Sequence, residues 1–103
     1  MAEKRSVKNV SIQVLPRGVD DALAVVDKAI ETIQASGVKY EVGPLETTME
    51  GDDLDRLIEI AKAAHRACFK AGATGVMTYI KISDSLQGTS MEKKVGKYRK
   101  VNL

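Results

Sequence analysis

The polar side chains best suited to hold a ligand lie in the segment 46–53, which is rich in carboxylates and hydroxyls. Glu46, Thr48 and Glu50 stand at alternate positions, so in an extended strand they share one face. Carboxylates beside hydroxyls can receive a cation or a ring amine through charge-assisted hydrogen bonds. The same composition is also typical of a solvated edge strand, because threonine fits a pleated sheet and charge on an edge prevents aggregation. The residue types alone leave both interpretations open.

Outside that segment, few residues could carry chemistry. Lys81, Ser83 and Asp84 form a second polar group at the end of a later predicted strand, where Asp84 could simply cap a turn. His65 and Cys68 are neighbours on a predicted helix, but they lie on its apolar stripe without further metal ligands or an orienting group. We therefore expect a buried structural role for this pair, with no metal site, no catalytic residue and no resident cofactor. Because no glycine motif for phosphate binding is present either, an enzyme is the weakest functional class.

Composition and charge reduce the number of functional classes to which the protein can belong. A chain of 103 residues predicts a single domain over residues 1–103, and its 44% hydrophobic and 29% charged residues exclude a disordered chain. The single cysteine, the lack of a long apolar run and the lack of a signal-peptide pattern predict a cytoplasmic protein without a membrane partner. Residues 92–103 carry a net charge of +4, yet with one Phe, three Tyr and no Trp we expect no nucleic-acid partner. Such a basic end is more often a solvated helix face.

The first half of the chain predicts a strand followed by a helix. Apolar and polar residues alternate over residues 7–15, with Val10, Ile12 and Val14 on one face and Ser11 and Gln13 on the other. Pro16 and Gly18 are expected to end this strand. A helix then begins at Asp20 or Asp21 and closes at Ser36-Gly37. Its apolar positions are Ala22, Val26, Ala29, Ile30 and Ile33.

The second half predicts a hairpin, a helix, a strand and a short basic helix. Residues 38–51 form two short strands with a tight connection at Gly43-Pro44, the second strand alternating from Leu45 onward. Asp52 or Asp53 caps the next helix. Its apolar stripe is Leu54, Leu57, Ile58, Ala61, Ala64, His65 and Cys68. Residues 76–84 form the last strand, and a basic helix is expected over about 91–100.

This order, β-α-β-β-α-β, is the ferredoxin-like split arrangement of the α+β class. It predicts a four-stranded antiparallel sheet with two helices on one face and a short C-terminal helix. The other face of the sheet would carry Ser11 and Gln13 from the first strand, and Met77 and Tyr79 from the last. An uncovered sheet with such side chains is expected to pair with a second copy of the chain.

Three segments resemble one known family. The first is the end of the first strand, Leu15-Pro16-Arg17-Gly18. The second is the element that contains Gly43, Pro44, Thr47, Glu50 and Gly51. The third is the C-terminal segment Tyr79–Asp84, which is followed by Met91–Val95. Together they resemble the small thiamine-binding proteins, and the resemblance covers nearly the whole chain in order. It implies a ferredoxin-like fold, a homo-oligomer built as a dimer of dimers, and non-catalytic binding of thiamine or its hydroxymethylpyrimidine moiety.

The resemblance also implies which residues hold the ligand. Carried onto this chain, the pocket candidates are Thr47, Thr48 and Glu50, with Ser11, Gln13, Ser83 and Asp84 as further candidates. Burying the positively charged thiazolium of thiamine needs an acid nearby, and we expect Glu50 to meet that need. The alternative is a structural or interaction module without a ligand, which would assemble through its open sheet and basic C-terminal helix.

Overall fold

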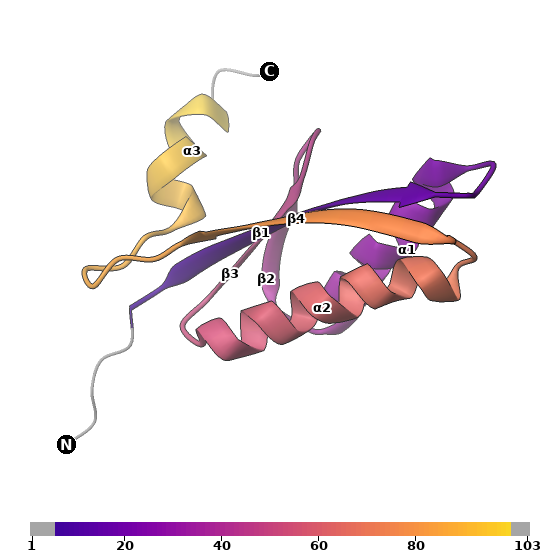
Figure 1. The fold of residues 1–103 in the computed structure, drawn as a ribbon. Coiled ribbons are helices and arrows are strands. Elements are labelled where there is room, and N and C mark those ends of the chain that lie inside the picture. The colour runs from indigo at the N-terminus through magenta and orange to yellow at the C-terminus, as the bar shows by residue number, and fades with distance from the viewer. Residues whose placement is uncertain (1–5, 100–103) are drawn as a thin grey trace.

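The computed structural model describes residues 6–99 and has the predicted α+β, ferredoxin-like architecture. The sheet is antiparallel with the strand order β2-β3-β1-β4, and α1 and α2 cover one of its faces (Figure 1). A short C-terminal helix, α3, lies on the opposite side of the sheet (Figure 1). The elements are β1 (Lys8–Arg17), α1 (Ala22–Ala35), β2 (Lys39–Val42), β3 (Thr47–Gly51), α2 (Leu54–Lys70), β4 (Gly75–Ser83) and α3 (Met91–Arg99).

The central strand β1 divides the molecule into a buried apolar face and a polar face. Val10, Ile12 and Val14 are buried toward the helices, as their alternation predicts. The strand nevertheless runs through Pro16 to Arg17, so the prediction that Pro16 ends it was wrong. The reason is that β3 pairs with β1 only as far as Ile12, and from there β1 pairs with β4 alone. A proline is tolerated there because one edge of the strand has no partner that needs its N–H.

Both long helices begin at the aspartates that were expected to cap them. The Asp21 carboxylate accepts the Ala24 N–H at 3.1 Å, and the Asp53 carboxylate accepts the Arg56 N–H at 3.3 Å. After the last turn of α1, Gly37 adopts the left-handed conformation, with φ of 78°.

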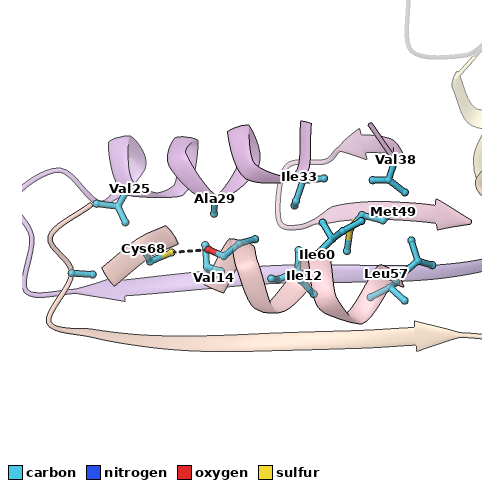
Figure 2. Close-up of a cluster of buried hydrophobic side chains, with 14 residues drawn as sticks. Ile12, Val14, Val25, Ala29, Ile33, Val38, Met49, Leu57, Ile60 and Cys68 are labelled. Carbon is cyan, nitrogen blue, oxygen red and sulfur yellow. Dashed lines mark hydrogen bonds between the residues drawn. The ribbon is translucent and has the colours of Figure 1, made fainter. Parts of the chain in front are cut away.

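The buried stripes of the helices differ at their margins from the predicted ones (Figure 2). In α1, Val25 is buried and Ala22 is exposed, because the stripe begins one turn later than predicted. In α2, Ile60 joins the core although the predicted stripe omitted it. The side chains that are fully buried and largest are Ile33, Met49, Leu57, Val10 and Cys68.

The β2–β3 connection is longer than the sequence pattern suggested. The Gly43 N–H donates to the Glu46 carbonyl at 2.9 Å and closes a turn over residues 43–46. β3 therefore begins at Thr47, and the prediction that Leu45 is part of this strand was wrong. Leu45 lies in the turn with 76% of its surface exposed. This turn also places Glu46 beside the sheet instead of within it.

β4 is an edge strand, so α1 and α2 cover the helix-facing side of this strand only partly. Ile80 and Ile82 lie opposite Ile12 and Val10 and share their face of the sheet, as predicted, but both remain exposed. Within residues 6–99, no helix is long and apolar enough to cross a membrane.

Candidate ligand-binding site

The antiparallel register brings polar side chains together on the sheet face that α1 and α2 leave uncovered. Ser11 of β1 lies between Thr48 of β3 and Lys81 of β4. Asn9, the preceding residue of β1 on this face, lies between Glu50 of β3 and Ser83 of β4. Residues directly opposite each other in a sheet share a face, so these side chains form one continuous polar floor.

Two walls rise from this floor, and together they enclose a cavity of about 380 Å³, which we call the cup. One wall is the β2–β3 hairpin and the other is α3, and both rise on the same side of the sheet (Figure 1). Ligand pockets commonly begin at roughly 300 Å³, so the cup is large enough for a small molecule. Its lining residues are Asn9, Ser11, Glu41, Glu46, Thr48, Lys81, Ile82, Ser83, Met91, Lys94 and Val95.

α3 is held over the floor by contacts to every strand of the sheet. At its start, the Met91 N–H donates to Glu50 Oε1 of β3 at 2.7 Å. In its middle, Lys94 Nζ donates to Asn9 Oδ1 of β1 at 2.7 Å and to Ser83 Oγ of β4 at 2.8 Å. At its end, Arg99 pairs with Glu41 of β2, so polar side chains fix the position of this wall.

Glu46 is one of two carboxylates in the lining of the cup; the other, Glu41, pairs with Arg99. The Glu46 carboxylate accepts the Ser11 hydroxyl at 3.0 Å and pairs with Lys81 Nζ at 3.0 Å. The hydrogen bond from Lys81 holds the pKa of Glu46 below its ordinary value; partial burial opposes this, and the Ser11 hydroxyl reinforces it. The carboxylate is therefore ionised at neutral pH.

Glu50 lies beneath the start of α3 instead of in the wall of the cup. Besides the Met91 N–H, it accepts the Asn9 amide at 3.2 Å and pairs with Lys39 Nζ at 3.0 Å, and only 9% of its side chain is exposed. Burial alone would raise the pKa of Glu50, but the hydrogen bonds from Met91, Lys39 and Asn9 outweigh it and hold the pKa below its ordinary value. Its visible role is to anchor α3.

The structure gathers some of the expected site residues and separates others. Ser11, Thr48 and Ser83 line the cup. Thr47 points to the opposite face of the sheet, where it is buried with 5% of its surface exposed. Gln13 lies farther along β1 opposite Tyr79, outside the cup. Asp84 follows the end of β4, where its carboxylate lies 3.8 Å from Lys8 Nζ.

Several residues of the cup were absent from the expected site. Asn9 shares the alternation of Ser11 along β1, and this signal could have identified it. Glu46 and Lys81 were singled out in the sequence as members of its two polar groups, but the resemblance did not make them pocket candidates. Nothing local identifies Glu41, Met91, Lys94 and Val95, because they reach the cup only through the position of α3.

The His65–Cys68 pair lies away from the cup. Cys68 is fully buried, and burial raises the pKa of its thiol. His65 is half-buried, with Nδ1 2.6 Å from Thr78 Oγ1 and its ring edge-on to Phe69. The described part of the chain contains no group of three or more His, Cys, Asp or Glu side chains that could hold a metal ion.

Comparisons with known proteins agree with this architecture. A family model described as "Thiamine-binding protein" matches residues 10–99. The UPF0045 protein CPE1503 of Clostridium perfringens is 51% identical over 92 residues, covering 88% of this chain and 96% of that protein. The UPF0045 protein YqgV of Bacillus subtilis is 33% identical over 91 residues, covering 82% of this chain and 86% of that protein.

Solved structures show the same fold. A domain of unknown function from Bacillus cereus is 44% identical, with a TM-score of 0.86 and 96% of each chain covered. A Thermotoga maritima protein, provisionally assigned to thiamine biosynthesis or salvage, is 37% identical with a TM-score of 0.80. That match covers 90% of this chain and 99% of the other.

Proposed function

The chain belongs to the thiamine-binding protein family, and we propose that it binds thiamine, or the hydroxymethylpyrimidine moiety of thiamine, without catalysing a reaction. The observation that carries this proposal is the cup itself. It combines an ionised carboxylate, Glu46, with the hydroxyls of Ser11 and Thr48 on the open face of the sheet.

The chemistry of the cup suits the parts of thiamine. The aminopyrimidine ring offers hydrogen-bond donors and acceptors, which the hydroxyls of Ser11 and Thr48 can satisfy in either direction. Met91 and Val95 of α3 supply apolar contact for a flat ring. The Glu46 carboxylate can accept the ring amine or face the thiazolium cation.

Lys81 does not block this role of Glu46. Its side chain is 70% exposed, and an exposed ion pair contributes only about 0–1 kcal/mol. A bound cation can therefore replace the ammonium of Lys81 beside Glu46 at little cost, while Lys81 turns into solvent.

Binding without catalysis agrees with the state of the carboxylates. A general acid or base works best when its pKa lies near the pH of the reaction. The pKa values of Glu46 and Glu50 are instead held below their ordinary value by hydrogen-bond donors. Such groups are suited to holding a charge in place.

We further propose that copies of the chain assemble into a dimer of dimers and that the protein is cytoplasmic. Leu15, Met77 and Tyr79 lie exposed on the sheet face that carries the cup, and a second copy could cover them. The free, buried thiol of Cys68 suits a reducing compartment. The same apolar side chains support the alternative function, an interaction module without a small-molecule ligand.

Titration calorimetry with thiamine and with hydroxymethylpyrimidine tests the proposal. Glu46→Gln removes the charge and keeps the shape, and we expect it to weaken thiamine binding about tenfold, the loss of one charge-assisted contact. Glu59→Gln is the matched control, because Glu59 is an exposed carboxylate on α2 that pairs with Lys62 far from the cup. If the unmodified protein binds neither compound, the binding function is refuted and the interaction module is favoured.

A further inference from the structure

Lys94 is a charged group in the cup, and free thiamine, which is itself a cation, offers no negative charge to neutralise it. The ammonium group of Lys94 contacts two neutral oxygens, Asn9 Oδ1 at 2.7 Å and Ser83 Oγ at 2.8 Å. Within residues 6–99, no carboxylate lies within salt-bridge distance of this ammonium group. Its positive charge is therefore held in place but not neutralised by a direct partner.

The other basic groups at the cup differ from Lys94 in this respect. Lys81 pairs with Glu46, and Arg99 pairs with both Glu41 and Glu92. The cup consequently has two unlike ends. Carboxylates line the hairpin wall, whereas the α3 wall presents an ammonium group without a carboxylate partner.

We propose that the cup prefers a ligand that is cationic at one end and carries a phosphate monoester at the other, with the phosphate bound by Lys94 and Ser83. This inference rests on the proposed function, and it assigns the phosphate ester of thiamine as the preferred form of the ligand. The thiazolium end lies toward Glu46, and the phosphate lies beside α3.

The chemistry of the α3 wall supports this assignment. A lysine ammonium group binds phosphate as a point charge, and hydrogen bonds between charged groups are about twice as strong as neutral ones. The Ser83 hydroxyl accepts from Lys94, so its own proton can be donated to a phosphate oxygen. A phosphate at this place displaces no existing carboxylate, so the gain is not offset by a broken ion pair.

The test compares the full-length protein with two variants of α3 by calorimetry in a phosphate-free buffer. The ligands are thiamine, thiamine monophosphate and inorganic phosphate. Lys94→Met removes the proposed phosphate contact and Lys94→Arg keeps the charge. Lys93→Met is the matched control, because it removes the same charge from the next residue, which does not line the cup. Circular dichroism confirms that each variant is folded.

The readout is the ratio of the dissociation constants for thiamine and thiamine monophosphate. We expect the unmodified protein to bind the monophosphate about tenfold more tightly, the value of one charge-assisted contact. The preference should disappear in Lys94→Met and persist in Lys94→Arg and Lys93→Met. Equal binding of both ligands by the unmodified protein, or an undiminished preference in Lys94→Met, refutes the inference while the thiamine-binding function stands.

Inorganic phosphate separates the two proposals. If thiamine does not bind but phosphate binds in a Lys94-dependent manner, the anion site is supported and thiamine is refuted as its ligand. If none of the three ligands binds, this inference fails and thiamine is refuted as the ligand of the cup.

Discussion

The substitution Glu50→Gln tests whether this carboxylate anchors α3 to the sheet. Glu50 accepts the Met91 N–H at 2.7 Å and the Asn9 amide at 3.2 Å, and it pairs with Lys39. Glutamine keeps one acceptor oxygen, so both hydrogen bonds can persist without their charge assistance, which is a loss of about 1 kcal/mol each. Lys39 is 65% exposed, so its ion pair adds at most about 1 kcal/mol.

We therefore expect Glu50→Gln to lower the free energy of unfolding by about 2 kcal/mol at pH 7. For a chain of this size that corresponds to a decrease in melting temperature of about 10 °C. Urea unfolding measures the change, and hydrogen exchange should show the loss of protection concentrated in α3, residues 91–99. Glu59→Gln, which removes an exposed carboxylate on α2, should change the stability by less than about 0.5 kcal/mol.

The stability difference between the unmodified protein and Glu50→Gln should depend on pH. Because the pKa of Glu50 is lower in the folded than in the unfolded chain, its stabilisation is complete above the ordinary value of 4.5. The stabilisation is lost as the pH falls through the folded pKa, whereas glutamine does not titrate. The difference between the two proteins should therefore shrink on acidification. The reasoning is wrong if Glu50→Gln behaves like Glu59→Gln at pH 7, or if the difference is undiminished at low pH.

Three further predictions concern the core, one helix end and the open sheet. Gly37→Ala should lower the free energy of unfolding by about 1 kcal/mol, because a φ of 78° strains any residue that has a Cβ. The added Cβ meets no neighbouring atom, so no clash contributes. An unchanged midpoint of urea unfolding would contradict this prediction. Cys68 should react slowly with iodoacetamide in the native protein and rapidly in urea, because it is buried and its pKa is raised; equal rates would contradict its burial. Met77→Lys should lower the mass measured by light scattering if the open sheet joins two copies, whereas Lys70→Met on α2 should not, and an unchanged mass would refute assembly through this surface.

Local signals were reliable for the buried face of the central strand and for the starts of the long helices. The alternation of Val10, Ile12 and Val14 identified the buried face of β1, and Asp21 and Asp53 marked the helix starts. One of the errors has its cause in a neighbouring element. Pro16 continues a strand because β3 has already ended its pairing with β1 at Ile12.

The candidate site shows the same division. The sequence by itself placed Ser11, Thr48 and Ser83 on one face of the sheet, because side chains in a strand alternate with a period of two. It also determined the fold class, through the order of its strand and helix patterns. The shared face depends on spacing within each strand, and the fold class depends on the order of these segments along the chain.

Only the tertiary structure decided which carboxylate faces the cup and which anchors its wall. Glu50 meets Met91 across 41 residues, Glu41 meets Arg99 across 58, and Asn9 meets Lys94 across 85. No periodicity within one segment encodes such sequence separations, because the position of α3 depends on the contacts that it makes with all four strands. The cup, and with it the separation of a carboxylate wall from an ammonium wall, exists only once that helix is in place.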